Sequence, residues 1–450
     1  MINEIFKDRE NIAIEYQGRA VSYPELSGLV FFYECELEKK GLVKGSRVCL
    51  NVADPLEYFV ILLSCFSKGI VVCPLSDSYS EEYKSTILEI FKPSEIIEGG
   101  SAFPVPIPLP DEDWKSGSID PDGLAMVTFT SGTTGVPKGV CHSLGNLLSC
   151  SKAFNAHNGL DSSTRMLHVM PKFYMAGILN TFLSPLVAGG SVVIADTFSA
   201  QNAHQLFKKF YETESNTVWL SPSMLMLSSK MTRDSKVIDW VGQIKAKLFI
   251  GTAPLPSGTK KFAEDKFSVE LLESYGTSEL LFISSAVSGE GHCDGVGRLL
   301  DGVELTVAED GELIVHTPWA MMGYLNADGL GFNTGDTGFI EQQHLHISGR
   351  KKDIIIKGGQ NISPRHVEEV ALGFSGISEA TVAAVPHSFW GEVPWLFVIP
   401  SPEFDIEKLK IWLNEKLSKD TQPEKIVVLD DFPRTVTGKV IKSELIEKYS

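Results

Sequence analysis

A short segment, residues 126–140, concentrates the residue types that bind phosphate. Its sequence, MVTFTSGTTGVPKGV, contains three glycines, four threonines, one serine and one lysine. Glycines allow successive backbone N–H groups to turn toward one anion, while hydroxyls and an ammonium group add further donors. Residues 124–129 are apolar and β-prone, so we expect a strand to lead into the loop. The segment favours a phosphate-binding loop over a plain solvated turn.

The loop differs from the Walker A motif, the nearest other phosphate loop. That motif needs an adjacent Gly-Lys pair followed by Ser or Thr. Here Pro137 precedes Lys138 and Gly139 follows it. The Walker A template therefore fails, and a phosphate loop of another kind is predicted.

The whole chain is acidic, and its overall electrostatic field therefore does not attract anionic ligands. It has 450 residues, a formal net charge of −17, 43% hydrophobic residues and 22% charged residues. This balance is typical of a globular, enzyme-sized protein. A surface this acidic repels phosphate backbones, so we expect no nucleic-acid partner, and an anionic ligand needs a local cradle.

Cysteine usage and hydrophobic patterning favour a cytoplasmic protein. The seven cysteines show no CxxC spacing, which is typical of reduced thiols and indicates neither a disulfide framework nor a zinc site. No stretch approaches the ~20 apolar residues that a membrane helix needs, so no transmembrane segment is expected. The first residues carry scattered charges and lack the apolar core of a signal peptide.

The elements around the loop alternate between strands and helices. The sequence predicts a strand from Arg47, a helix over 55–69 and a strand over 70–75. The same alternation is predicted again farther along the chain, with a helix over 176–188 and a strand over 191–195. This alternation predicts parallel strands joined by crossover helices.

The pattern changes at the segment GRKKD, residues 349–353. Before it, short antiparallel strands are predicted within 311–324 and 344–349. After it, a small α+β unit of about a hundred residues begins, which is a comfortable domain size. We therefore predict a large domain over 1–349 and a second domain over 353–450, joined by residues 350–352.

Several motifs together carry a family resemblance. The segment TFTSGTTGVPKGV resembles the phosphate loop of the adenylate-forming superfamily, which includes acyl- and aryl-CoA synthetases, peptide-synthetase adenylation domains and firefly luciferase. Further segments resemble the other motifs of the superfamily, in the same order and over nearly the whole chain. They are GTAPLP (251–256), YGTSE (275–279), GVGRLLDGVEL (295–305), GELIVHTPWAMMGY (311–324), NTGD (333–336), GRKKDIIIKGGQNISPRHVEE (349–369) and PRTVTGKV (433–440).

The resemblance implies an α/β fold of multidomain α+β type and a two-step reaction. The fold has a large N-terminal domain of mixed sheets flanked by helices and a small, mobile C-terminal α+β domain. In the first step a carboxylate attacks the α-phosphate of ATP and forms an acyl-adenylate and pyrophosphate. In the second step a thiol takes the acyl group and AMP leaves.

The resemblance also assigns roles in the first step. Lys439 matches the catalytic lysine that bridges the carboxylate and the α-phosphate, and Arg434 and Gly438 are expected to present it. Glu279 matches the magnesium-linked glutamate, with Thr134 as a second contact to Mg²⁺, and Thr277 is placed with the catalytic residues. Positive charge and a metal are needed because two anions must meet. Taken alone, a lysine or glutamate in these positions is more often a solvated charge.

The nucleoside has its own matching residues. Asp336 matches the carboxylate that binds the ribose hydroxyls, Arg350 matches an arginine that also contacts the ribose, and Tyr275 is expected to stack on adenine. Residues 251–254 resemble the strand that lies along the adenine edge. The complete predicted ATP- and AMP-binding set is Thr130, Ser131, Gly132, Thr133, Thr134, Gly135, Lys138, Gly251, Thr252, Ala253, Pro254, Tyr275, Gly276, Asp336 and Arg350.

The second step implies a hinge and a passage for the thiol. Lys352 falls at the superfamily hinge, so residues 350–352 are expected to pivot. Gly358 and Gly359 stand in a Gly-Gly-x-Asn-Ile-x-Pro segment that we associate with acid–CoA ligases, and a glycine pair lets a pantetheine arm pass close to the backbone. This favours CoA over a carrier protein as the acceptor.

The sequence says less about the acid substrate than about the nucleotide or the thiol. The segment MPKFYMAGI, residues 170–178, carries Tyr174 where the superfamily commonly has histidine, and it offers no aspartate for an amino-acid substrate. Lys172 and Lys138 are the only nearby cations, and neither is assigned to the acid tail. The candidate pocket is mainly apolar, which predicts a neutral acyl or aryl tail. Its residues are Phe173, Tyr174, Met175, Gly177, Trp219, Ser221, Gly251, Leu281 and Phe282.

Three functions follow from these residues. The leading prediction is an AMP-forming acid–CoA ligase that uses ATP, Mg²⁺ and CoA with a small carboxylic acid. The second is an adenylating enzyme that loads a phosphopantetheinyl carrier protein. The third is a non-catalytic nucleotide-binding subunit. Such a subunit has no need for Lys439, so the presence of Lys439 together with Lys138, Glu279, Asp336 and Arg350 counts against this alternative.

Overall fold

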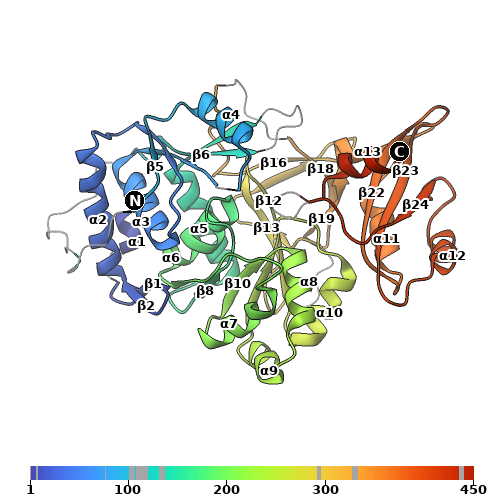
Figure 1. The fold of residues 1–450 in the computed structure, drawn as a ribbon, viewed down its shortest axis with the longest axis horizontal. Coiled ribbons are helices and arrows are strands. Elements are labelled where there is room, and N and C mark those ends of the chain that lie inside the picture. Colours follow the sequence, from blue (N-terminus) through green and yellow to red (C-terminus); the bar gives the residue numbers. More distant parts are fainter. Residues whose placement is uncertain are drawn as a thin grey trace.

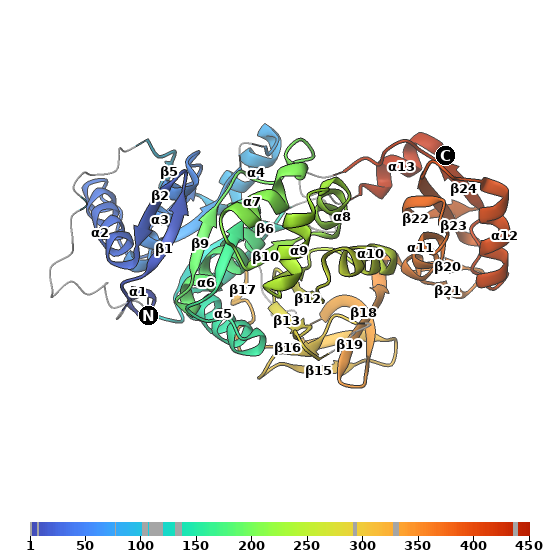
Figure 2. The same ribbon diagram turned by 90° about the horizontal axis from the view of Figure 1, so that it is seen from below.

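The structure is a computed structural model of the chain (Figure 1). It describes residues 2–6, 9–76, 78–100, 107, 120–130, 137–290, 295–326, 333–434 and 440–450. Figures 1 and 2 show a large body of sheets and helices, with a smaller unit at one end beside α10 and the strands β18 and β19. The chain therefore has a large and a small domain, while the predicted bounds 1–349 and 353–450 stay a prediction.

One sheet of the large domain positions the predicted phosphate loop. Its strand order is β17-β7-β6-β4-β3-β5, with β3, β4, β5 and β6 parallel and β6, β7 and β17 antiparallel. Helix α3 crosses from β3 to β4; Asp54 caps its start, and Gly69 ends it with a left-handed φ of 65°. The predicted strand–helix–strand unit is confirmed. The bounds are β3 Arg47–Leu50, α3 Pro55–Lys68, β4 Val71–Pro74, α4 Glu81–Phe91, β5 Glu95–Ile97, β6 Leu124–Thr130, β7 Lys138–Ser143 and β17 Gly323–Tyr324.

A second sheet has nine strands in the order β14-β13-β12-β11-β10-β8-β9-β1-β2. Each neighbouring pair of strands from β12 to β1 is parallel. Parallel neighbours need a crossover connection, and the predicted helix over 176–188 lies between the parallel strands β8 and β9 in the chain. The bounds of its strands are β1 Ile12–Tyr16, β2 Arg19–Ser22, β8 Arg165–His168, β9 Ser191–Ile194, β10 Thr217–Leu220, β11 Lys247–Ile250, β12 Leu271–Thr277, β13 Leu281–Ser285 and β14 Arg298–Leu299.

Helices cover both of these sheets, and one of them has unusual geometry. The segment predicted as a single helix begins as a π-helix, η1 Ala176–Leu183, and continues as α6 Ser184–Ala188. In the π form each backbone hydrogen bond spans one more residue than in an α-helix. The other helices are α1 Asn3–Phe6, α2 Tyr23–Lys39, α5 Leu144–Asn158, η2 Ala203–Gln205, α7 Leu206–Glu212, α8 Pro222–Met231, α9 Ser235–Gln243 and α10 Ser257–Phe267.

The core of the large domain lies between the two sheets. Phe59 of α3 stacks on Phe182 of η1 with ring centroids 3.9 Å apart, and both rings are fully buried. Phe154 of α5 stacks on Phe282 of β13 at 4.0 Å. Burial of such aromatic area is the main favourable term in folding. It also fixes the relative position of the sheets that carry the candidate site.

A small antiparallel sheet closes the large domain, and the second domain follows it. The order of this sheet is β15-β16-β18-β19, and β16 and β19 confirm the antiparallel strands predicted within 311–324 and 344–349, whereas β15 and β18 were not predicted. The bounds are β15 Glu304–Val307, β16 Glu312–His316, β18 Asn333–Glu341 and β19 His344–Arg350, followed by the 3-10 turn η3 Lys351–Asp353.

The second domain has its own sheet and core. Val382, Leu396 and Leu409 are among the residues buried within it. Its elements are β20 Ile355–Lys357, β21 Gln360–Ile362, α11 Pro364–Leu372, β22 Ile377–His387, β23 Gly391–Pro400, α12 Ile406–Lys416, β24 Lys425–Val428 and α13 Lys442–Tyr449. Within the described ranges, no helix has the length and apolar character needed to cross a bilayer.

Candidate active site

Two of the predicted segments lie outside the described residues. These are the loop 131–136, with Ser131, Gly132, Thr133, Thr134 and Gly135, and the segment 435–439, with Gly438 and Lys439. Their neighbours are placed. Thr130 at the end of β6 pairs with Lys138 at the start of β7, and Arg434, which also forms an ion pair with Glu379, bridges to Val440.

Lys138 and Glu279 are linked through Tyr324. Strand β17 pairs with β7, which places the Tyr324 ring 5.2 Å from the Lys138 ammonium. The Tyr324 hydroxyl donates a hydrogen bond of 3.0 Å to Glu279 Oε1. Burial, and then the Glu279 carboxylate, raise the pKa of Tyr324 to about 12, so the phenol remains a donor at neutral pH. Tyr324 was not predicted as a site residue, although it is the last residue of the motif 311–324.

The turn that carries Glu279 is fixed from two sides. His142 of β7 lies 2.7 Å from the Ser278 carbonyl through Nε2, and burial lowers the pKa of His142 to about 4. The ring is therefore neutral at pH 7 and donates through Nε2. Within the turn, the Leu280 N–H donates to the Thr277 hydroxyl at 3.0 Å. Thr277 thus helps to shape the turn, and its predicted catalytic role stays a prediction.

The residues predicted for the ribose lie together. Asp336 and Arg350 face each other across β18 and β19, and Arg350 Nε lies 3.1 Å from Asp336 Oδ1. The Tyr275 hydroxyl donates to Asp336 Oδ2 at 2.6 Å. Burial, and then Asp336, raise the pKa of Tyr275 well above its ordinary value, so Tyr275 is a neutral donor. This hydrogen bond was not predicted, and stacking of the Tyr275 ring on adenine stays a prediction.

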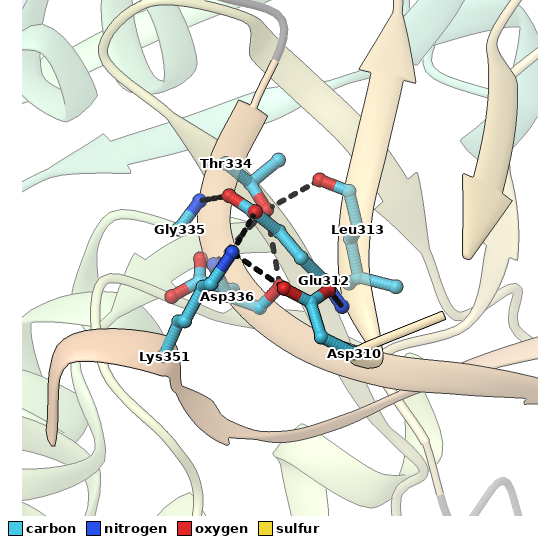
Figure 3. A network of polar contacts seen from close by, with 7 residues as sticks. All are labelled: Asp310, Glu312, Leu313, Thr334, Gly335, Asp336 and Lys351. Atoms are coloured by element: carbon cyan, nitrogen blue, oxygen red, sulfur yellow. Dashed lines mark hydrogen bonds and ion pairs between the residues drawn. The ribbon is translucent and has the colours of Figure 1, made fainter. Parts of the chain in front are cut away.

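A network of polar contacts supports the turn before Asp336 (Figure 3). The Thr334 hydroxyl donates to the Leu313 carbonyl at 2.8 Å and accepts from the Asp336 N–H at 3.1 Å. The Gly335 N–H donates to Glu312 Oε1 at 3.3 Å. Glu312 and Asp310 also bind Lys351, which directly follows Arg350. The carboxylate of Asp336 is thereby held on a turn with little freedom.

Two predicted glycines allow close approach of other groups. A Cβ atom at Gly251 would lie 2.7 Å from the ring of Trp219, and one at Gly276 would lie 2.1 Å from the Leu281 carbonyl oxygen. Neither position accepts a side chain without a shift of its neighbours. Residues 252–254, which follow β11, are exposed, as a segment along the edge of a bound base must be.

The residues predicted for the acid lie in two packed groups. Phe173 contacts Tyr79 edge to face at 5.5 Å, and burial raises the pKa of Tyr174. Gly177 is required by close packing, since a Cβ atom there would lie 2.1 Å from the Pro171 carbonyl oxygen. Met175 directly precedes η1, and Lys172 donates to the Ala53 carbonyl at 2.7 Å.

The second group surrounds β10. Trp219 is buried against Phe154, Phe249 and Phe282, with centroids 5.5–5.8 Å away. Ser221 caps α8 by accepting from the Met224 N–H at 3.3 Å. Leu281 is buried and has a left-handed φ of 55°. Which members of the two groups line an acid site stays a prediction.

The residues predicted for the second step are exposed. Lys352 lies in η3, and Gly358 and Gly359 form the turn between β20 and β21 with left-handed φ values of 57° and 88°. The Gly358 N–H donates to the Trp390 carbonyl at 2.8 Å, and a Cβ atom at Gly358 would lie 2.8 Å from the Trp390 ring. Side chains that could hold a metal in groups of three or more are absent from the part of the chain that the structure describes.

The chain is similar to known families and proteins. The family model "AMP-binding enzyme" matches residues 4–325, and "AMP-binding enzyme C-terminal domain" matches residues 366–439. A 2-succinylbenzoate–CoA ligase of Bacillus licheniformis is 26% identical over 463 residues and covers 94% of both chains. A protein of the same name from Enterococcus faecalis is 29% identical over 345 residues, 72% of this chain and 69% of its own length.

Solved structures show the same fold. ATP-bound MatB from Rhodopseudomonas palustris superposes with a TM-score of 0.88 at 24% identity and covers 100% of this chain and 98% of its own. The o-succinylbenzoate CoA synthetase MenE from Bacillus subtilis, in complex with an acyl-adenylate, superposes with a TM-score of 0.83 at 23% identity over 99% of this chain and 97% of its own. The predicted fold class is confirmed. The chain belongs to the AMP-binding enzymes, the adenylate-forming superfamily that its motifs resemble.

Proposed function

We propose that the chain is an AMP-forming acid–CoA ligase. It activates a carboxylic acid with ATP, releases pyrophosphate, and transfers the acyl group from the adenylate to the thiol of CoA. Curated relatives that match most of this chain are named as CoA ligases, which supports an enzyme over a non-catalytic subunit and CoA over a carrier protein.

One observation supports the proposal most: the segment 275–279 contacts residues of both groups that are predicted to bind the nucleotide. Its first residue, Tyr275, is hydrogen-bonded to Asp336, and its last, Glu279, is hydrogen-bonded to Tyr324 beside Lys138. An acceptor of ribose hydroxyls and a cation for phosphate are thus attached to one short turn. This is the arrangement that a nucleoside triphosphate needs along its length.

In the first step, positive charge must be provided where two anions meet. Lys138 supplies an ammonium group at the phosphate loop, and Lys439 is assigned to the carboxylate and the α-phosphate. Glu279 offers a hard carboxylate oxygen of the kind that Mg²⁺ binds, with Thr134 as its proposed companion. When bound, Mg²⁺ neutralises charge on the triphosphate. Tyr324 orients Glu279 for that contact.

In the second step, the small domain turns about Lys352 and brings Gly358 and Gly359 toward the adenylate. The exposed backbone of this glycine turn offers a surface along which a pantetheine arm passes. The thiol attacks the acyl carbon, the bond between that carbon and the phosphate oxygen breaks, and AMP leaves.

The acid has a neutral aryl or acyl tail. The predicted residues around η1 and β10 are mainly aromatic or aliphatic, and Lys172 already donates to the Ala53 carbonyl. The relatives are named for 2-succinylbenzoate, an aromatic acid that carries a second carboxylate. An aromatic acid therefore fits both observations best.

A panel of carboxylic acids tests the proposal. Purified protein is given ATP, Mg²⁺ and straight-chain acids, benzoates or 2-succinylbenzoate, and pyrophosphate release is measured before CoA is added for thioester detection. We expect acid-dependent pyrophosphate from at least one aromatic acid, and its loss in Glu279→Gln. Pyrophosphate release that no acid stimulates would contradict the proposal.

A further inference from the structure

The side chain of Lys351 is held by two carboxylates of the large domain. Its ammonium lies 2.6 Å from Asp310 Oδ2 and 2.7 Å from Glu312 Oε2 (Figure 3). The hydrogen bonds to Asp310 and Glu312 raise the pKa of Lys351, and Lys351 in turn lowers the pKa of Asp310. All of these contacts are charge-assisted, which makes them stronger than neutral hydrogen bonds. We call Lys351, Asp310 and Glu312 the Lys351 clamp.

The clamp lies directly beside the ribose-binding pair. Lys351 follows Arg350, and Glu312 uses its second oxygen to accept from the N–H of Gly335, which precedes Asp336. The Glu312 side chain is only 8% exposed, whereas the side chains of Lys351 and Asp310 are half-exposed, so Glu312 is the shielded member of the clamp. A single buried carboxylate therefore touches both chain positions that adjoin the Asp336–Arg350 pair.

The clamp also lies directly before the proposed pivot. Lys352 is the next residue, and beyond it the small domain returns to β19 through the Ser363 hydroxyl, which donates to the Ser348 carbonyl at 2.8 Å. That neutral hydrogen bond is a weaker connection than two ion pairs. When the small domain turns, rotation that spread backward past Lys351 would move Arg350 away from Asp336.

We propose that the Lys351 clamp confines the domain rotation to residues after Lys351 and so retains the acyl-adenylate between the two half-reactions. This inference rests on the proposed ligase function. Lys351, Asp310 and Glu312 are positioning residues, since they act through Arg350 and Asp336. Without the clamp, part of the adenylate leaves the site during rotation and is hydrolysed by water to the free acid and AMP.

The ratio of pyrophosphate to thioester tests the clamp. In the full chain with ATP, CoA and the acid found above, the ratio should be close to one. In Lys351→Met, which keeps the length of the side chain and removes its charge, we expect the ratio to rise at least threefold. AMP should exceed thioester by the same amount, because hydrolysis of the adenylate releases AMP and the free acid without forming thioester. Glu312→Gln should act in the same direction, and the double variant should add little, because both changes open one clamp.

Two variants control for general damage. Lys351→Arg keeps the charge and should restore a ratio near one. Lys40→Met removes an ion pair of similar length, 2.7 Å to Glu95, elsewhere in the large domain, and should leave the ratio unchanged. A purely structural clamp would slow both half-reactions equally. An unchanged ratio in Lys351→Met, or an equal rise in Lys40→Met, overturns the proposal.

A binding measurement separates this inference from the proposed function. If the wild-type chain makes no thioester from any acid, the ligase proposal has failed. Calorimetric titration with AMP then still decides on the clamp. Loss of the clamp should weaken AMP binding several-fold in Lys351→Met and not in Lys40→Met. Equal AMP affinity in both variants overturns it.

Discussion

The residues assigned to the ribose and those assigned to the acid are held in place by different forces. On the ribose side, Asp336 is fixed by a tyrosine hydroxyl at 2.6 Å and by an arginine at 3.1 Å. On the acid side, Phe173 and Trp219 are fixed by ring packing at 5.5 Å or more. Directional contacts suit a group that every substrate shares, such as a nucleotide, whereas packed shapes can change from one acid to another.

The largest expected effect concerns the chemistry between the two sides. In Lys439→Ala, formation of the adenylate from acid and ATP should slow ~10²–10³-fold, or about 3–4 kcal/mol, because one electrostatic contact to the transition state is lost. Conversion of a supplied acyl-adenylate to thioester should stay near the normal rate. Two single-turnover assays on this variant give both numbers. Equal damage to both steps would place Lys439 in a structural role.

The packed acid side should be sensitive to added volume. In Gly177→Val the new side chain meets the Pro171 carbonyl oxygen, so we expect a loss of about 2–3 kcal/mol in the free energy of unfolding. Gly258→Ala in α10 is the matched control, because nothing lies within 4 Å of the added atom, and its stability should stay equal or rise slightly. Urea unfolding compares the two. Similar losses in both would mean that packing at Gly177 is not special.

Buried histidines on each side should give the stability a pH dependence. Burial lowers the pKa of His142 to about 4 and of His168, which bonds to Thr181, to about 3. In the unfolded chain both titrate near 6.5, so as pH falls below this value the unfolded state takes up protons that the folded state refuses. The free energy of unfolding should then fall by up to about 1.4 kcal/mol per pH unit for each histidine. Their contribution is fully present above pH 6.5.

Substitution separates the two histidines. His142→Gln and His168→Gln should each flatten the slope of stability against pH between 6.5 and 4.5, as measured by urea unfolding. A slope that neither substitution alters would show that other groups control acid unfolding.

The smallest expected effect should best distinguish the residues assigned to the ribose from those assigned to the acid. Asp336→Asn keeps the size of the side chain and removes the charge, so we expect AMP to bind about tenfold more weakly, equivalent to about 1.4 kcal/mol. The KM for the acid should not change, because the acid-side residues do not depend on this carboxylate. Calorimetry and steady-state kinetics measure the two quantities. A parallel rise in the KM for the acid would show that the acid-side residues depend on Asp336 after all.

The sequence predicted what depends on local pattern. The unit from Arg47 to Pro74 and the strands within 311–324 and 344–349 follow from short-range periodicity. The meeting of Asp336 with Arg350 followed only from family motifs. Contacts such as Tyr324 with Glu279 or His142 with Ser278 join strands that are distant in sequence, and a local pattern carries no signal for them. Likewise, the sequence could not show that Trp219 packs among three phenylalanines.

The π-helix η1 has a consequence for how such chains diverge. A π-helical stretch is equivalent to an α-helix that has received one extra residue. Removal of one codon within Ala176–Leu183 would return the stretch to α geometry, while the preceding segment, which carries Phe173, Tyr174 and Met175, would keep its orientation. A lineage can thus gain or lose one residue here without turning the segments on either side of the helix. An alignment that places no gap here would then pair residues that do not occupy the same place.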